Sequence, residues 1–200
     1  MFEQKPYAPS CDKNTDPILE VLKLYLPEQK SLLEFGAGTG QHAIAMAPHF
    51  PNIVWTISDR EENHKGIQLW LQDFPRVNLR GPLSFDIDRD TFPEGHFDTV
   101  FTANTLHILS WEQNLKLYSL LGESLPNESL FLVYGAFNYN GNFTSESNQR
   151  FEQWLKNRDP KSGIRDFESV SSELFKVGFD LIRDHEMPAN NRLLVFKKCR

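Results

Sequence analysis

The L-E-F-G-A-G-T-G stretch at residues 33–40 constrains the fold of this chain more than any other segment. An apolar run at 31–35 ends in three glycines at alternate positions, and a helical pattern follows at 41–50. Glycine is favoured where the backbone takes a positive φ or lies directly against a ligand. The first N–H groups of a helix attract nucleotide-like and carboxylate-bearing ligands. The stretch therefore predicts a strand, a tight turn and a helix N-terminus that together form a ligand site.

The spacing of the glycines distinguishes this turn from the dinucleotide-binding fingerprint. That fingerprint has its third glycine at the position that Gln41 occupies here. The order G-x-G-x-G after an acid instead resembles motif I of class I S-adenosylmethionine (SAM) dependent methyltransferases. The resemblance implies that the turn holds the methionine end of SAM through Glu34, Gly36, Ala37, Gly38 and Gly40.

Composition limits the classes to which the chain can belong. It has 200 residues, of which 40% are hydrophobic, and this suits a single α/β domain spanning 1–200. The net charge of −6 without a basic run argues against a nucleic-acid partner. No apolar run approaches the roughly 20 residues that span a bilayer, so no membrane partner is expected. Cys11 and Cys199 form no C-x-x-C pair, which predicts free thiols, a cytoplasmic location and no metal site.

Strand-like and helical patterns alternate along the chain. Residues 1–13 are predicted to be irregular, and Asp16-Pro17 has the acid and the proline of a helix start. The candidate strands are 31–35, 53–58, 78–85, 99–103, 129–134, 179–186 and 192–197. The later candidate helices are 41–50, 61–74, 111–121, 145–157 and 167–177, the last with Gly178 as its C-cap glycine.

The last two candidate strands decide between fold classes. Only residues 187–191 separate them, too few for a crossover helix, so they are expected to form an antiparallel hairpin. The earlier alternation predicts a mostly parallel sheet with helices on both faces. A seven-stranded sheet with this ending resembles the Rossmann-like class I methyltransferase fold, whereas a dehydrogenase domain is all parallel.

Acidic residues follow the second and third candidate strands. A carboxylate at the position of Asp59 can accept two hydrogen bonds from vicinal ribose hydroxyls, and the resemblance implies that role toward SAM. The alternative is that Asp59 caps the helix that begins near Glu61. After the third strand, the resemblance places Asp86 against the adenine amino group and Ile87 over the adenine ring. The alternative there is a loop of solvated acids at 86–90.

The segment H-F-D-T-V-F-T-A-N-T-L-H at 96–107 resembles motif IV of the same superfamily. Asn104 marks the carboxyl end of the fourth strand, where the resemblance implies that the backbone meets SAM. His107 follows three residues later and is the candidate catalytic residue, because imidazole titrates near neutrality and can take a proton from an acceptor. The alternative is that His107 caps the helix that begins near Ser110.

The segment 134–145 is rich in glycine, asparagine and aromatic residues, and it lies where a substrate lid is expected. Phe137 and, just beyond the segment, Asn148 are candidate substrate-binding residues. The alternative is a packed surface loop with aromatic anchors, in which Ser145 is used as a helix cap. Asn190 is a third candidate, although an Asn-Asn pair also suits a plain turn because asparagine tolerates a positive φ.

Longer phrases resemble one small methyltransferase group of unknown function, the methyltransferase-like 26 type. They are N-x-D-P-I-L-E-V-L from 14, S-D at 58–59, A-N-T-L-H-I from 103, G-N-F-T-S-E-S-N from 141, R-D-P-K-S-G-I-R-D from 158 and M-P-A-N-N from 187. The resemblance implies that Asn14 binds SAM. Lys13 stands where arginine is commoner, and a lysine there would meet the SAM carboxylate as a point charge rather than as a fork.

Together these features predict a SAM-dependent methyltransferase that acts on a small polar acceptor and releases S-adenosyl-L-homocysteine (SAH). The protein mainly aligns the acceptor and excludes water, since the cofactor carries the activated group. The first alternative is a non-catalytic module that binds a protein partner, which the intact glycine turn disfavours. The second is a nicotinamide-dependent reductase, which Gln41 and the terminal hairpin disfavour. The sequence defines neither the acceptor atom nor the oligomeric state.

Overall fold

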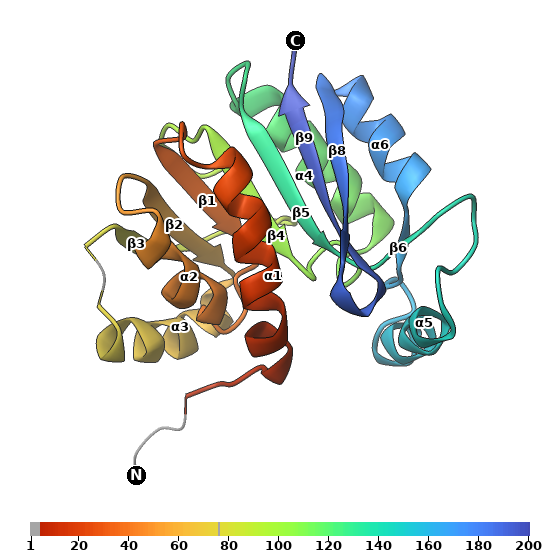
Figure 1. Cartoon of the computed structure of the whole chain (residues 1–200), viewed down its shortest axis with the longest axis horizontal. Helices are drawn as coiled ribbons and strands as arrows, with labels where there is room; N and C mark the ends of the chain where they lie inside the picture. The colour runs from red at the N-terminus through yellow and green to blue at the C-terminus, as the bar shows by residue number, and fades with distance from the viewer. Residues whose placement is uncertain (1–4, 76) are drawn as a thin grey trace. The chain divides into compact units, whose positions relative to one another are not determined.

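The computed structural model describes residues 5–75 and 77–200 (Figure 1). Its main sheet has seven strands in the order β3-β2-β1-β4-β5-β9-β8, and β6 and β7 form a second, two-stranded sheet. The chain divides into two compact units, unit 1 at 1–101 and unit 2 at 102–200. The predicted Rossmann-like fold class, a mixed sheet surrounded by helices, is confirmed. The single domain expected from the sequence stays a prediction.

Unit 1 is a parallel sheet with its connecting helices. In the sheet, β1 pairs with β2 and with β4, and β2 pairs with β3, all in parallel. The strands are β1 (Ser31–Phe35), β2 (Val54–Asp59), β3 (Leu79–Ser84) and β4 (Thr99–Ala103), whose last two residues belong to unit 2. The helices are α1 (Pro9–Tyr25), α2 (Gln41–Met46), the 3-10 turn η1 (Ala47–His49) and α3 (Glu61–Asp73).

Aromatic and aliphatic side chains of the inner strands form the core of unit 1. Leu32 and Leu33 are fully buried, and the rings of Trp55 and Phe101 meet edge to face with their centroids 6.1 Å apart. Asn78, the residue before β3, closes the segment before β2, because its amide donates to three backbone carbonyls between residues 47 and 53 at 3.0–3.1 Å. This fixed frame carries the glycine turn at the end of β1.

The start of α1 differs from the prediction. The helix begins at Pro9 rather than at Pro17, so 9–13 are helical, and of the expected irregular segment only 5–8 lie in the described part of the chain without helix. Pro9 holds the first-turn position that suits proline, and Pro17 stands inside the helix. The Thr15 hydroxyl bonds back to Cys11 O at 2.8 Å and approaches the His42 ring at 3.2 Å. The helix therefore already packs on α2 before the predicted start at Asp16-Pro17.

Unit 2 is built on an antiparallel arrangement. Strand β9 (Asn191–Lys198) pairs in antiparallel with both β5 (Leu130–Gly135) and β8 (Phe179–Met187), which confirms the predicted hairpin. The turn η2 (Pro188–Asn190) has Ala189 and Asn190 at positive φ. The helices are α4 (Trp111–Ser124), α5 (Glu146–Arg158) and α6 (Phe167–Lys176). The pair β6 (Phe137–Asn138) and β7 (Arg165–Asp166) was not predicted.

Side-chain caps fix the starts of the three helices of unit 2. Ser110 and Gln113 form a capping box on α4, Ser145 caps α5, and Asp166 caps α6. Gly178 follows α6 at a φ of 96°, as predicted for a C-cap glycine. Because their starts are fixed, these helices place the loops that carry the candidate residues of unit 2.

Two further findings bear on the classes considered from the sequence. Within residues 5–75 and 77–200, no helix has both the length and the apolar character needed to cross a membrane. Cys11 and Cys199 are free thiols, as predicted.

Candidate functional site

The three glycines of the turn after β1 all adopt a left-handed backbone. Gly36, Gly38 and Gly40 have φ values of 68°, 60° and 81°, in the region that disfavours side chains. Gly38 is exposed, and a Cβ added to it would meet nothing within 4 Å, whereas one on Gly40 would lie 3.3 Å from Ile67 of α3. The turn therefore packs against α3 at its third glycine and is open at its second.

Asp59 lies directly beside this turn. Its side chain is buried, and Oδ2 accepts from the Gly38 N–H at 2.6 Å, while Oδ1 accepts from Arg60 N at 2.7 Å and from the Asn63 amide at 2.8 Å. The cap position of α3 is held by Arg60, so the alternative reading of Asp59 as that cap is wrong. The carboxylate thus faces the open glycine, and its ribose role stays a prediction.

Glu34 precedes the turn and lies under it. The side chain is 2% exposed, and Oε2 accepts from the Trp55 indole N–H at 2.7 Å. Burial raises the pKa of Glu34 to about 8, against the opposing effect of the Trp55 hydrogen bond. The Glu34 side chain is therefore held by Trp55 of β2, and its role toward a cofactor stays a prediction.

The other candidate residues of unit 1 lie at its loops and on α1. Asp86 is half-buried: Oδ1 accepts from Asp88 N at 2.9 Å, and its own N–H donates to Asp90 at 2.7 Å. The acids of this loop are therefore bound to one another's backbone. Ile87 is buried in the same loop, and Asn14 is half-buried on α1. The adenine role of Asp86 and Ile87 and the SAM role of Asn14 stay predictions.

In unit 2, Asn104 and His107 lie on the loop after β4. Asn104 has a positive φ of 58°, and its N–H donates to Tyr134 O at 2.8 Å. His107 is 4% exposed, and its ring meets Phe151 edge to face with the centroids 5.0 Å apart. Burial is the larger of two effects that lower the pKa of His107 to about 4, and the charge of Arg165 is the smaller. Since Ser110 caps α4, the alternative reading of His107 as that cap is wrong.

The candidate residues Asn148 and Asn190 come together in the structure. The Asn148 amide donates to Asn190 O at 3.1 Å and to Thr144 Oγ1 at 2.8 Å, and the Asn190 amide donates to Ser147 Oγ at 3.3 Å. The start of α5 is therefore tied to the β8–β9 turn. Phe137 lies in β6 and is 1% exposed. No contact decides whether these three residues bind a substrate, so that role stays a prediction.

Comparison with known proteins places the chain in a family. It matches the family described as "Protein of unknown function (DUF938)" over residues 5–198, almost its whole length. The chain belongs to this family.

Solved structures of methyltransferases have the same fold as this DUF938 chain. The SAM-dependent methyltransferase SibL, in its apo form, is 22% identical, with a TM-score of 0.79 over 96% of this chain and 56% of its own. An O-methyltransferase family 2 protein from Planctomyces limnophilus, in complex with apigenin, is 18% identical, with a TM-score of 0.82 over 94% of this chain and 60% of its own. PigF with SAH is 16% identical, with a TM-score of 0.81 over 94% and 56%. The DUF938 chain therefore spans little more than half of these proteins, and at such identities they establish the fold.

The segment 158–166 holds the His107 loop through hydrogen bonds that were not predicted from the sequence. Gly163 N donates to His107 O at 2.8 Å, Ser162 Oγ donates to Ile108 O at 2.7 Å, and Arg165 donates to the carbonyls of Leu106 and Leu109. From α4, the fully buried Asn114 donates to Leu106 O at 2.9 Å and Ser110 O at 2.8 Å. The R-D-P-K-S-G-I-R-D phrase singles out this segment in the sequence, but nothing in it indicates a contact with the His107 loop.

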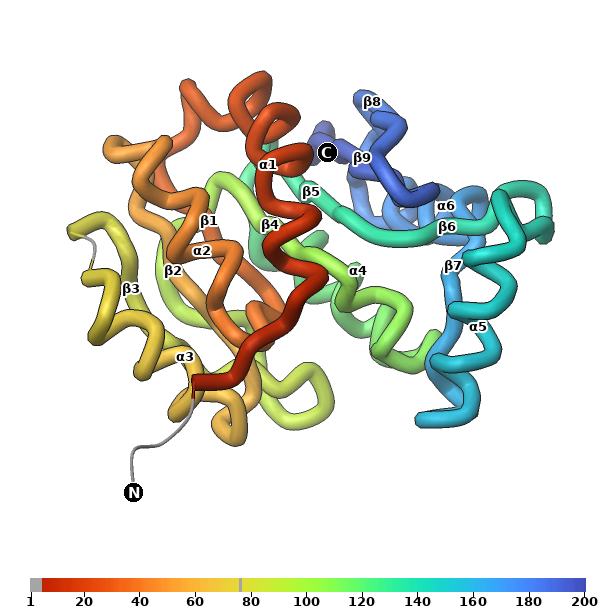
Figure 2. Tube along the Cα trace, turned by 60° about the horizontal axis from the view of Figure 1, so that its bottom comes forward, coloured from red at the N-terminus to blue at the C-terminus, as the bar shows by residue number. Residues whose placement is uncertain are grey.

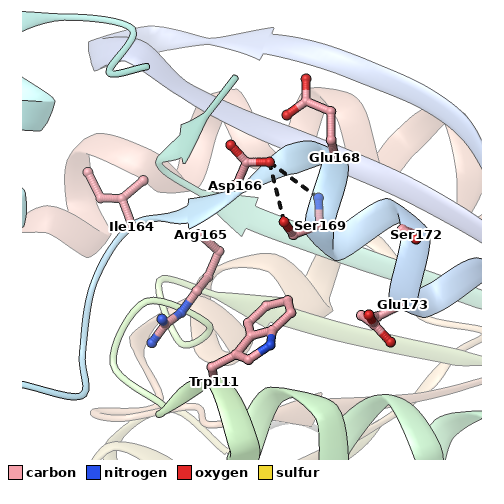
Figure 3. A pocket seen from close by; sticks show the side chains of 8 residues that line it. All are labelled: Trp111, Ile164, Arg165, Asp166, Glu168, Ser169, Ser172 and Glu173. Carbon is pink, nitrogen blue, oxygen red and sulfur yellow. Dashed lines mark hydrogen bonds between the residues drawn. The ribbon is translucent and has the colours of Figure 1, made fainter. Parts of the chain in front are cut away.

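A surface pocket of about 560 Å³ lies at the start of α6. Figure 3 shows Trp111 on one side and the guanidinium of Arg165 turned away from the carboxylates that line the pocket. All three of those carboxylates are already engaged, because Asp166 caps α6, Glu168 accepts from Asn140 N at 3.0 Å and Glu173 pairs with Lys176 at 2.7 Å. None of the site residues predicted from the sequence lines this pocket, whose lining is Trp111, Ile164, Arg165, Asp166, Glu168, Ser169, Ser172 and Glu173.

Proposed function

We propose that this DUF938 protein is a SAM-dependent methyltransferase that acts on a small polar acceptor. The observation that carries the proposal is the glycine turn of unit 1, with three left-handed glycines and the buried Asp59 carboxylate on the N–H of the open one. A turn that only joined a strand to a helix would not need an open glycine beside a buried acid. The methyltransferase fold supports the same conclusion independently.

The residues of unit 1 suit the parts of SAM. An ionised carboxylate accepts about four hydrogen bonds, and the Asp59 carboxylate already accepts three, so one acceptor position is left for a ribose hydroxyl. The open side of Gly38 gives room for the methionine portion. Asp86 and Ile87 are the proposed adenine contacts, and Asn14, Glu34 and Ala37 complete the proposed cofactor set of unit 1. When bound, SAM supplies the activated methyl group.

His107 is the proposed catalytic residue of unit 2. Because its pKa is lowered to about 4, the imidazole is neutral at physiological pH; it is a weak base, and its proposed role is to orient the acceptor through a hydrogen bond from the acceptor to a ring nitrogen. The hydrogen bonds to its loop from the segment 158–166 hold the ring in one place. Phe137, Asn148 and Asn190 are the proposed substrate residues. The structure of the Planctomyces limnophilus protein with apigenin supports a small-molecule acceptor by analogy of fold alone.

Titration calorimetry with SAM and SAH tests the proposal. Wild-type protein is expected to bind both, and Asp59→Ala to bind them about 10- to 100-fold more weakly, as the loss of a charge-assisted hydrogen bond predicts. Asp59→Asn keeps the shape of the side chain, and Asp180→Ala in β8 of unit 2 is the control for loss of an acid. Circular dichroism confirms that each variant is folded.

Two outcomes would contradict this proposal, and they differ in meaning. Unchanged affinity in folded Asp59→Ala would remove Asp59 from the cofactor site. Failure of wild-type protein to bind SAM or SAH at millimolar concentration would instead favour the non-catalytic module that acts through a protein partner.

A further inference from the structure

The residue that breaks the dinucleotide pattern, Gln41, binds both the segment before α1 and the first turn of α1. Gln41 is the first residue of α2 and directly follows Gly40, yet its side chain is only 6% exposed. Its Oε1 accepts from Ala8 N at 2.7 Å and from Thr39 Oγ1 at 3.0 Å, and its Nε2 donates to Asp12 Oδ1 at 3.2 Å. One amide therefore joins three points, two in the N-terminal segment and one in the glycine turn.

The other end of this segment is held on α3. Trp70 donates its indole N–H to Pro6 O at 2.8 Å, and Lys5 pairs with Asp73 while its ammonium lies 4.6 Å from the centre of the Trp70 ring. Figure 2 shows the chain before α1 running past the end of α3. Residues 5–12, here called the strap, thus reach from α3 to the first residue after the glycine turn.

Gly66 allows this close approach. It is the residue of α3 beneath Pro6, and a Cβ added there would lie 2.5 Å from Pro6 Cγ. Such a distance cannot be accommodated without movement, and Pro6 is a ring on the strap rather than the end of a flexible side chain. A glycine inside a helix costs about 1 kcal/mol relative to alanine, so its presence under Pro6 is consistent with a need for the strap to sit flat.

The strap is held by a small number of contacts, most of them polar. Gln41, Trp70 and Asp73 each contact it through a polar group, and Tyr7 of the strap is 56% exposed. A segment with few buried apolar contacts opens without unfolding the domain beneath it. The part of the chain nearest the glycine turn is therefore also one that can be released.

We propose that the strap retains SAM and SAH on the glycine turn, and that Gln41 is the positioning residue that latches it. This inference rests on the proposed function. A latched strap excludes water from the methionine end of the ligand and must open before product leaves. In consequence, the rate of SAH release depends on residues that do not touch SAH.

Two full-length variants release the strap in different ways. Gln41→Ala removes the latch, and Gly66→Ala drives Pro6 from α3 while raising the helix propensity of α3. Gln68→Ala, at an exposed position of α3, is the matched control. Hydrogen exchange of the strap amides is measured first, without ligand, and SAH dissociation is then measured by stopped-flow displacement.

Both variants are expected to exchange the strap amides faster and to release SAH about tenfold faster, with Gln68→Ala like wild type. For Gln41→Ala this factor is of the size expected from the loss of its hydrogen bonds to Ala8 and Asp12. Faster strap exchange with unchanged SAH release would overturn the retention role, and unchanged strap exchange in Gln41→Ala would overturn the latch. If wild-type protein does not bind SAH at all, it is the proposed function that fails, and the strap then has no cofactor to retain.

Discussion

Replacing Glu34 with glutamine removes a buried titratable group from β1 while leaving the shape of the side chain nearly unchanged. Burial raises the pKa of Glu34 from 4.5 to about 8, because the carboxylate loses its hydration. The nearby charge of Asp59 raises the pKa further, and the Trp55 indole acts in the opposite direction. Since desolvation is the largest effect, the folded protein holds Glu34 as the neutral acid at pH 7.

The raised pKa makes the free energy of unfolding depend on pH. A carboxyl group whose pKa is higher in the folded state contributes its full stability below about pH 4.5, and this contribution is lost as the pH rises toward 8. At about 1.4 kcal/mol per pH unit, the rise from 4.5 to about 8 corresponds to at most about 5 kcal/mol. Relaxation around the ionised group reduces this, so about 2–4 kcal/mol is expected by pH 9.

Glu34→Gln should lack this dependence, because its amide stays neutral and still accepts from the Trp55 indole. We expect the variant to match wild type at pH 5 and to exceed it in free energy of unfolding by about 2–4 kcal/mol at pH 9. Urea unfolding followed by circular dichroism at pH 5, 7 and 9 measures the difference. Glu20→Gln, at an exposed acid of α1, controls for loss of surface charge. Parallel pH profiles for wild type and Glu34→Gln would refute the reasoning.

Two further predictions concern the His107 loop. The His107 imidazole, with its pKa lowered to about 4, should be neutral at pH 6 in nitrogen-15 NMR spectra. The stability that the neutral, buried ring contributes should be lost only as the pH falls from about 6.5 toward 4. A titration midpoint near 6.5 would contradict the burial argument. Asn114→Ala removes the donor to the Leu106 and Ser110 carbonyls and should lower the free energy of unfolding by about 2–3 kcal/mol in urea. Asn157→Ala on the exposed end of α5 is its control, and equal losses in the two variants would contradict a special role for Asn114.

The sequence predicted the long strands and the glycine turn because their signals are local. Apolar runs of five or six residues and glycines at fixed spacing report the strand and the turn directly. The two-residue strands β6 and β7 give no such signal, because Phe137–Asn138 and Arg165–Asp166 are paired only by the fold. The early start of α1 was missed for the same reason. Asp16-Pro17 has the local pattern of a helix start, and only contacts with Gln41 and His42 show that the helix begins earlier, at Pro9.

The residues of the candidate site also fall into two groups: the positions of some follow from the local sequence, and those of others depend on contacts between distant segments. The ends of β1 and β2 placed Gly38 and Asp59 correctly, because parallel strands bring their carboxyl ends to one edge of the sheet. Arg165 and Gln41 were not foreseen as holding residues, since a guanidinium or amide in a sequence gives no sign of which backbone carbonyl or N–H it will meet. Both side chains use their polar groups on the backbone of distant segments. The residues proposed to contact ligands were therefore chosen from motifs, whereas those that hold the loops became visible only in three dimensions. Substitutions at Gln41 should consequently change cofactor release while leaving every residue of the glycine motif in place.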